Sequence, residues 1–130
     1  MGIVFRKLMQ DDLDVFIEMR INQLREEGVE SNLDLKPHLY GYYIRHLEDG
    51  TFISWLAIDD RKIVGTSGMS FVEKPPYYSN PHGKIGLLSS MYTLKEYRRK
   101  GIAKELLDRV VNEAKDYGFK KNENFMQYIF

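Results

Sequence analysis

The sequence predicts a single α+β domain, and three observations support this fold class. Apolar residues recur at helical spacing in three separate segments, at about 11–27, 35–48 and 100–117. Two apolar runs at 51–58 and 63–72 flank a short polar turn, which is typical of a β-hairpin. The length of 130 residues is enough for one hydrophobic core. We therefore expect one domain over residues 1–130.

The composition is that of an ordinary globular domain, and it argues against several functions. The chain has 19 basic and 19 acidic residues, so its zero net charge argues against a general binder of nucleic acids or membrane surfaces. It has no cysteine, which excludes disulfides, thiolate metal sites and a cysteine nucleophile within this sequence. No stretch approaches the roughly 20 apolar residues of a membrane span, and no signal peptide is visible. We therefore expect a cytoplasmic protein. We also expect no metal site, because the three histidines are scattered along the sequence: His38, His46 and His82.

The first half of the chain is predicted to contain one strand and two helices. The strand is Ile3–Leu8, and Asp11 or Asp12 caps a helix that runs to about Glu27 and stops at Gly28. A polar link leads to a second helix at about 35–48. The first helix has an apolar face formed by Leu13, Phe16, Ile17, Ile21 and Leu24. The tyrosines of the second helix are interpreted as packing residues rather than a ligand site: Tyr40, Tyr42 and Tyr43.

The second half is predicted to contain a hairpin, a long loop, a strand, a helix and a closing strand. Gly65 and Gly68, inside the second hairpin strand, indicate a β-bulge or a close backbone approach. The loop Lys74–Lys84 is long enough to be functional. A strand at Ile85–Thr93, a helix at about 100–117 and a strand at 124–130 complete the order.

The stretch from Met91 to Leu107 is the strongest candidate for a binding site. It combines the end of a strand, a short basic loop and the start of an amphipathic helix, where free backbone N–H groups attract anions. Cations are disfavoured at the positive end of a helix dipole. Four of them nevertheless gather there: Arg98, Arg99, Lys100 and Lys104. A bound polyanion such as a pyrophosphate would neutralise this cluster, and a solvated basic loop is the alternative.

The residues Arg98-Arg99-Lys100-Gly101-Ile102-Ala103 fit the pattern (Arg/Gln)-x-x-Gly-x-(Gly/Ala). With the preceding Met91-Tyr92-Thr93 and the order of elements, the chain resembles the GCN5-related N-acetyltransferase (GNAT) superfamily from Ile3 to about Tyr117. The resemblance implies an α/β/α sandwich of the acyl-CoA N-acyltransferase type, with a mixed, mostly antiparallel sheet between helices. Competing phosphate motifs, such as Gly-x-x-x-x-Gly-Lys-(Ser/Thr), are absent from the sequence.

The resemblance also implies acetyl-CoA as co-substrate and assigns residues to it. The pantetheine would lie along the strand at Met91, Tyr92 and Thr93, pairing with the backbone as an added strand does. The pyrophosphate would sit on the N–H groups of Arg99, Lys100, Gly101, Ile102, Ala103 and Lys104. Gly101 would allow close backbone approach, and Arg98 would add charge-assisted bonds.

The implied reaction is direct attack of an amine on the thioester carbonyl. An alkylammonium with a pKa of about 10.4 must first lose a proton, which costs about 4–5 kcal/mol at pH 7. The acceptor would be a small-molecule or peptide amine that contacts Glu27–Tyr43 and Lys74–Lys84, and a homodimer is left open. A catalytically silent acyl-CoA-binding module and a small nucleic-acid-binding domain are alternatives.

Two departures from the family pattern leave the acid and the base unassigned. Many relatives carry a carboxylate just before the position of Met91, where this chain has Ser89 and Ser90. The base candidates by region are Glu27, Glu30 and Glu73, and the alternative interpretation of each is a solvated surface carboxylate. The family's thiolate-protonating tyrosine would stand four residues before Gly118, but that position is Ala114, and Tyr117 does not match.

The C-terminal tail is the second departure. The family has a strand, a helix and a final strand after the glycine-motif helix, whereas here Gly118-Phe119 follows almost directly and looks like the start of the final segment. By average element lengths, about 20–25 residues would then be lacking between Asp116 and Phe119. Two explanations stay open: a real deletion, or a stretch that the 130-residue sequence does not include.

Overall fold

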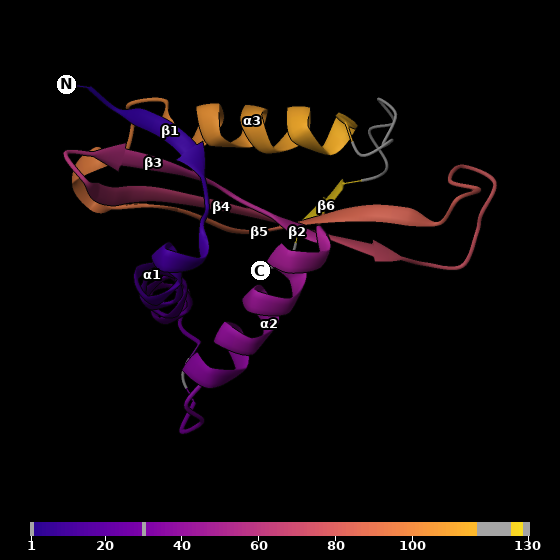
Figure 1. Cartoon of the computed structure of the whole chain (residues 1–130), viewed down its shortest axis with the longest axis horizontal. Helices are drawn as coiled ribbons and strands as arrows, with labels where there is room; N and C mark the ends of the chain where they lie inside the picture. The colour runs from indigo at the N-terminus through magenta and orange to yellow at the C-terminus, as the bar shows by residue number, and fades with distance from the viewer. Residues whose placement is uncertain (1, 30, 117–125, 129–130) are drawn as a thin grey trace.

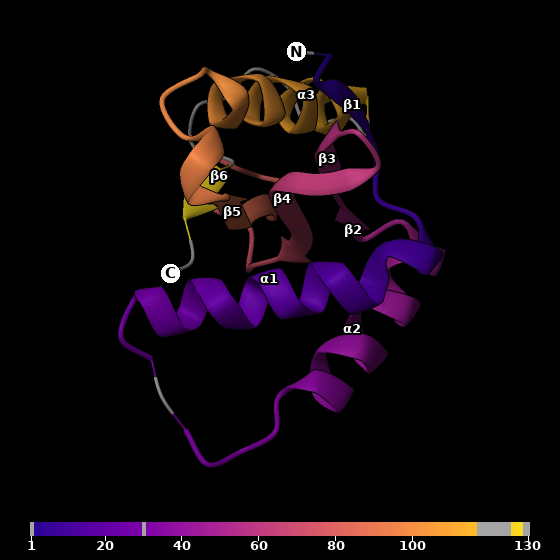
Figure 2. The ribbon, with the colours of Figure 1, turned by 90° about the vertical axis from the view of Figure 1, so that its left-hand side faces the viewer.

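One β-sheet separates helix α3 from helices α1 and α2 (Figures 1 and 2). The computed structural model describes residues 2–29, 31–116 and 126–128. The helices are α1 (Leu13–Glu26), α2 (Lys36–Asp49) and α3 (Ile102–Asp116). The strands are β1 (Val4–Lys7), β2 (Phe52–Ile53), β3 (Trp55–Asp59), β4 (Lys62–Glu73), β5 (Lys84–Thr93) and β6 (Met126–Tyr128). This α+β arrangement is the fold class that the sequence predicts.

The sheet is mostly antiparallel, with one parallel pair at its end. The strand order is β1-β3-β4-β5-β6, and the short β2 pairs with β4 beside this path. Only β6 runs parallel to its neighbour, and it pairs with β5 over Gly86–Leu88. The β4–β5 hairpin extends beyond the helical layers at one end of the molecule (Figure 1). The parallel pair matters for the site because it leaves the second half of β5 without a strand partner on that side among the described residues.

Strand β5 contains a β-bulge close to its C-terminal end. Thr66 pairs with Tyr92 and Gly68 pairs with Ser89, so Ser67 alone faces two residues, Ser90 and Met91. Ser90 adopts a left-handed conformation, with φ of 57°, which costs free energy in a non-glycine residue. The bulge expected from Gly65 and Gly68 is therefore present, and the extra residue lies in β5 opposite β4.

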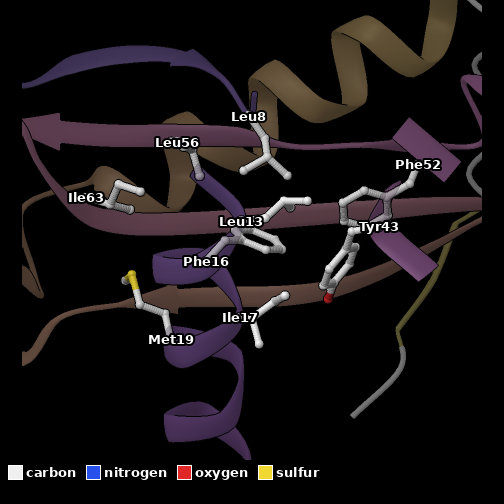
Figure 3. Packing of buried hydrophobic residues seen from close by; sticks show 9 residues of the cluster. All are labelled: Leu8, Leu13, Phe16, Ile17, Met19, Tyr43, Phe52, Leu56 and Ile63. Carbon is white, nitrogen blue, oxygen red and sulfur yellow. The ribbon is translucent and has the colours of Figure 1, made fainter. Parts of the chain in front are cut away.

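Two apolar layers hold the helices on the sheet. Below the sheet, α1 buries Leu13, Phe16 and Ile17, which meet aromatic rings from α2 and β2 (Figure 3). The ring centroids of Phe16 and Tyr43 are 5.1 Å apart, and those of Tyr43 and Phe52 are 5.0 Å apart. Above the sheet, α3 buries a stripe of apolar residues: Ile102, Leu106, Val110 and Ala114. Of the face expected for the first helix, Leu13, Phe16 and Ile17 are in the core, whereas Ile21 and Leu24 are partly exposed.

The structure differs from the expected elements at two places in the first half. The expected strand 51–58 is divided at Ser54, whose hydroxyl donates to the Ser67 carbonyl oxygen at 2.5 Å. Asp12 does stand at the N-cap of α1, but its carboxylate makes no capping bond to the helix. It accepts two bonds from the Arg6 guanidinium, at 2.7 and 2.8 Å, and the backbone N–H of Met9. The bonds from Arg6 lower the pKa of Asp12 below its ordinary value.

The interpretation of the tail as a final segment needs a correction. Met126–Tyr128 forms β6, which pairs in parallel with β5. A strand, a helix and a parallel neighbouring strand form the ordinary crossover connection, so β6 occupies the place of the strand that directly follows the helix. The segment of about 20–25 residues that seemed to be lacking between Asp116 and Phe119 has the length of about one strand and one helix. β6 can join the sheet without it. Residues 117–125, with Tyr117, Gly118 and Phe119, lie outside the described residues.

The contact between α3 and the sheet depends on the absence of a side chain at Gly65. A Cβ atom there would lie 3.0 Å from Ile102 Cγ2, 3.1 Å from Leu106 Cδ1 and 3.3 Å from Ala57 Cβ. We predict that Gly65→Ala lowers the free energy of unfolding by about 1–3 kcal/mol, because overpacking displaces α3. Urea denaturation monitored by circular dichroism measures this change.

Gly41→Ala in α2 is the matched control for Gly65→Ala. A Cβ atom at Gly41 would meet only Arg45 Nη1, at an ordinary contact distance of 3.5 Å. Alanine inside a helix is more favourable than glycine by about 0.8–1.0 kcal/mol, so this variant is expected to be slightly more stable. Equal stability of the Gly65→Ala variant and the wild type would contradict the proposed close packing of α3.

Candidate functional site

The C-terminal half of β5 presents an unpaired backbone edge. Within the described residues, β6 reaches only to Leu88, so Ser89–Thr93 has a strand neighbour only on the β4 side. The carbonyl oxygen of Ser90 faces β4, where it accepts the hydroxyl of Thr66 at 2.7 Å. The carbonyl oxygens of Met91 and Thr93 instead accept side chains from outside the sheet. An extended ligand can add to such an edge in the way that another strand would.

Two long side chains hydrogen-bond this edge. Gln23, on α1, donates from Nε2 to the Met91 carbonyl oxygen at 3.2 Å. Arg98, in the loop after β5, donates from Nε to the Thr93 carbonyl oxygen at 2.7 Å. Arg20 Nη1 in turn donates to Gln23 Oε1 at 3.1 Å. The end of β5 is therefore tied both to α1 and to the loop that follows it.

The loop between β5 and α3 forms a tight turn with two left-handed residues. Arg99 has φ of 63° and Gly101 has φ of 80°. The carbonyl oxygen of Gly101 accepts the N–H of Glu105 at 3.1 Å, so α3 begins directly after the turn. A Cβ atom built on Gly101 meets no protein atom within 4 Å, so the space beside this glycine is open. The turn therefore leaves room for a ligand at the positive end of the α3 dipole.

Three of the four cations of this loop contact different groups. Lys104 pairs with Asp108 on α3 at 3.0 Å, and the Lys100 ammonium lies 5.5 Å from the centroid of the Tyr97 ring. Arg98 turns back towards the strand, where its Nη2 lies 3.4 Å from Glu26 Oε1. The guanidinium carbon of Arg98 is 5.6 Å from the Tyr92 ring centroid. Arg98, the first residue of the motif, therefore contacts the end of β5 rather than the turn.

A buried pair of hydroxyls lies at the bulge. The side chain of Ser90 is 2% exposed, and its Oγ has no hydrogen-bond partner of ordinary geometry in the described part of the chain. The phenol of Tyr43, 4% exposed, is its neighbour. Burial raises the pKa of Tyr43, while the nearby Ser90 hydroxyl and the Arg20 charge lower it in part. Tyr43 is therefore a hydrogen-bond donor at neutral pH, and Ser90 has capacity left for a ligand or a water.

Glu26, Tyr92 and Arg98 form a cluster where the C-terminal end of α1 meets the end of β5. The pKa of Glu26 is lowered, mainly by its hydrogen bond with the Tyr92 hydroxyl and then by Arg98. The pKa of Tyr92 is raised, first by burial and then by Glu26. Glu26 is thus a carboxylate at neutral pH, on the same side of the sheet as α1.

Comparisons with known proteins identify the family. The model of the acetyltransferase (GNAT) family matches residues 17–124. The chain belongs to the GNAT family. The match covers α1 from Ile17 onward, α2, the bulged strand, the turn and α3, so it includes every residue of the site described above.

Solved structures agree with this assignment. A predicted acetyltransferase from Clostridium acetobutylicum, crystallised with acetyl-CoA, is 32% identical with a TM-score of 0.90, covering 99% of this chain and 81% of that one. A GCN5-related N-acetyltransferase from Ralstonia eutropha JMP134 is 23% identical with a TM-score of 0.87, covering 99% and 84%. A glucosamine-6-phosphate N-acetyltransferase from Arabidopsis thaliana shares the fold at 15% identity, with a TM-score of 0.73 and coverage of 100% and 83%. Among curated protein sequences, none matches the chain.

The GNAT motif residues predicted from the sequence come together at one end of the sheet. Met91, Tyr92 and Thr93 end β5, and the residues from Arg98 to Lys104 form the turn and the first turn of α3. The sequence did not point to Gln23, Glu26 or the closeness of Ser90 to Tyr43. The signal available for the first two was a polar stripe on α1 at spacings of three, formed by Arg20, Gln23 and Glu26.

Of the carboxylates proposed as bases by region, Glu73 lies far from the GNAT site. Glu73 pairs with Lys84 at the far end of β5, about 23 Å from Met91 at the rise of a strand, so its candidacy is wrong. Glu27 is exposed just after α1, and Glu30 lies outside the described residues. The structure brings Glu26, the residue before Glu27, to the end of β5 instead.

A cavity lies where the sequence placed acceptor contacts. Its volume is about 670 Å³, and it lies between α1 and the segment that leads to α2. Its walls include Ile21, Leu24 and Leu33. These α1 residues are on a different face of the helix from Gln23, which contacts β5. In the described part of the chain, no three His, Asp or Glu residues are placed to hold a metal ion, and no helix is long and apolar enough to cross a membrane.

The unpartnered hydroxyl of Ser90 leads to a stability prediction. Removing a buried hydroxyl that makes no hydrogen bond removes a desolvation cost, so we expect Ser90→Ala to keep or raise the free energy of unfolding by up to about 1 kcal/mol. Chemical denaturation of the ligand-free protein measures the difference.

Thr66→Val is the contrasting variant for Ser90→Ala. It removes a hydroxyl that does donate, to the Ser90 carbonyl oxygen, and is expected to cost about 0.5–1.5 kcal/mol. A larger loss for Ser90→Ala than for Thr66→Val would mean that the Ser90 hydroxyl has a partner in the native protein.

Proposed function

We propose that this chain is an N-acetyltransferase that transfers the acetyl group of acetyl-CoA to an amine. One observation carries the proposal: the unpaired edge of β5 at Met91–Thr93 runs directly into a left-handed turn at the start of α3. The edge suits the amide-bearing pantetheine arm, and the turn suits the pyrophosphate. Membership of the GNAT family and the acetyl-CoA bound to the Clostridium acetobutylicum protein support the same co-substrate.

The proposed placement of acetyl-CoA uses backbone groups more than side chains. The pantetheine amides would pair with Met91 and Thr93, whose carbonyl oxygens can accept a second bond beside Gln23 and Arg98. The pyrophosphate would take the N–H groups of Arg99 to Lys104. Arg99 and Lys100 supply the positive charge of this turn, and the open space beside Gly101 admits the phosphate oxygens.

The proposed reaction is a direct transfer without an acyl-enzyme. The lone pair of the neutral amine attacks the thioester carbonyl carbon and forms a C–N bond, the C–S bond breaks, and the products are an amide and CoA. The amine gives up its proton to solvent, and the thiolate of CoA takes one up. A backbone N–H group on the unpaired edge of β5 is suited to polarise the carbonyl, because the strand fixes it before the substrate binds.

The hydroxyls of Tyr43 and Ser90, near the bulge, are suited to take part in proton transfer. Tyr43 stays protonated at neutral pH because burial raises its pKa, so it can donate a hydrogen bond to a leaving thiolate but cannot act as a base. The Ser90 hydroxyl beside it has capacity left for a hydrogen bond to a substrate atom or a water. The ionised Glu26 would attract a cationic amine to the α1 side of the sheet.

The acceptor class is proposed as a small-molecule or peptide amine. Two proteins with the same fold are named for amino sugars: an aminoglycoside acetyltransferase from a soil metagenomic sample and the Arabidopsis glucosamine-6-phosphate N-acetyltransferase. The mixed acidic and aromatic character of residues 27–43 suits such an amine. A cytoplasmic location and a homodimer are further proposals, testable by cell fractionation and analytical ultracentrifugation.

The deciding experiment follows thiol release from acetyl-CoA with a panel of polyamines, amino sugars and peptides. Release that depends on the amine, with acetylated product found by mass spectrometry, supports the enzyme. Tight acetyl-CoA binding without transfer to any amine would favour the silent acyl-CoA-binding module. Strongly salt-dependent binding of DNA or RNA, without binding of CoA, would favour the nucleic-acid alternative.

We predict that Gly101→Glu abolishes CoA binding while the protein stays folded. The glutamate places a side chain and a negative charge in the open space where the pyrophosphate would sit, and it strains a residue with φ of 80°. Isothermal titration calorimetry with CoA should show at least a hundredfold loss of affinity, on the order of 3 kcal/mol.

Gly28→Glu is the matched control for Gly101→Glu. Gly28 also has a left-handed backbone, with φ of 82°, and a Cβ atom there also meets nothing within 4 Å. It follows α1 instead of opening α3, so its variant should share the strain but keep the CoA affinity of the wild type. Unchanged affinity in the Gly101→Glu variant would overturn the pyrophosphate assignment.

A further inference from the structure

The first arginine of the glycine motif is directed away from the phosphate turn. Arg98 precedes the left-handed Arg99, and its guanidinium lies back over the end of β5. Its Nε donates to the Thr93 carbonyl oxygen at 2.7 Å, its Nη2 lies 3.4 Å from Glu26, and its carbon lies 5.6 Å from the Tyr92 ring centroid. Three different groups on two elements therefore hold this one side chain.

These contacts join segments that are far apart in the sequence. Glu26 ends α1, whereas Tyr92 and Thr93 end β5. The hydrogen bond from Arg98 to Thr93 also closes the short segment that contains the 3₁₀ turn Lys95–Tyr97. The bond therefore fixes the spacing between the unpaired strand edge and the turn at the start of α3.

We infer that Arg98 is a positioning residue for the pantetheine arm of acetyl-CoA and not a ligand of its phosphates. This inference rests on the proposed function. Arg98 holds the carbonyl group of Thr93 and, through Glu26, keeps the end of β5 against α1. The phosphate charge is met by the neighbouring cations of the turn, Arg99 among them, and by the backbone N–H groups of α3.

Charge balance supports this assignment. The guanidinium of Arg98 already has a carboxylate partner in Glu26, and its contact with Glu26 contributes to the lowered pKa of that carboxylate after the Tyr92 hydroxyl. Moving the guanidinium from the end of β5 to a phosphate at the turn would break its bonds to Thr93 and Glu26. Within the described residues, no hydrogen bond or ion pair holds the Arg99 side chain, so it can meet a phosphate without such a loss.

The test separates the two halves of the ligand. Calorimetry measures affinity for acetyl-CoA and for adenosine 3′,5′-bisphosphate, which carries phosphates but no pantetheine. If Arg98 positions the pantetheine edge, Arg98→Ala weakens acetyl-CoA about tenfold, as loss of a charge-assisted bond does, and changes the bisphosphate affinity less than about twofold. Arg99→Ala, the matched control, should weaken both ligands by similar factors and flatten their salt dependence.

Two conservative variants guard against misfolding. Arg98→Gln keeps an N–H donor for the Thr93 carbonyl oxygen but removes the charge, so it should recover most of the acetyl-CoA affinity that Arg98→Ala loses. Glu26→Gln removes the anchoring charge on α1 and should cause a smaller loss, again confined to acetyl-CoA. An unfolded protein would lose both ligands together, and its thermal unfolding curve would show it.

Each outcome bears on one statement. If Arg98→Ala or Arg98→Gln weakens the bisphosphate as much as acetyl-CoA while the protein stays folded, Arg98 binds phosphate and the inference is wrong. If neither variant changes the affinity for acetyl-CoA, Arg98 positions nothing and the inference is equally wrong. If the wild-type protein does not bind acetyl-CoA, the proposed function itself fails.

Discussion

The unequal pairing of β5 is the constraint on which the rest of the site depends. β5 pairs with β4 along its length, but β6 accompanies it only over Gly86–Leu88. A strand edge left unpaired exposes backbone groups that must find other partners or attract another chain. Here side chains from α1 and from the following loop reach that edge, through Gln23 and Arg98. The site is thus an incomplete sheet whose missing strand is supplied in part by side chains and, we propose, by substrate.

The bulge in β5 explains how the unpaired edge can support a reaction as well as bind a ligand. Two residues of β5 oppose Ser67, so the strand bends there and Ser90 takes a strained, left-handed conformation with a buried, unpartnered hydroxyl. Such strain persists only where the surrounding structure holds it, and here Thr66 holds the Ser90 carbonyl group from β4. β5 thus keeps its pairing with β4 on both sides of the bulge, while the bulge leaves the Ser90 hydroxyl available for a ligand.

Local sequence patterns predicted most of the helices and strands, because the apolar face of a helix and the turn of a hairpin each depend on a short stretch of sequence. The motif around Gly101 likewise predicted a short loop between strand and helix, and in the structure Gly101 takes a left-handed conformation, which favours glycine. The sequence could not give the direction of Arg98, because a motif fixes the backbone and leaves the rotamer to neighbours such as Glu26, which is distant in the chain. Glu73 was misplaced because a base chosen by region ignores strand length, and β4 carries it to the far end of the hairpin. The tail was misread because a two-residue likeness at Gly118-Phe119 weighed more than the crossover rule that makes β6 the neighbour of β5.

Holding a strand end and binding a phosphate make opposite demands on an arginine. A phosphate ligand must be free to meet an incoming anion, so its charge should be unpaired before binding. A positioning residue must be held in place before binding, so that the strand edge is ordered when the ligand arrives and less entropy is lost. Arg98 meets the second demand, because a carbonyl oxygen, a carboxylate and an aromatic ring fix its guanidinium at one place. The same motif can therefore divide its cations between two tasks, with the backbone reversal at Arg99 as the point where they separate.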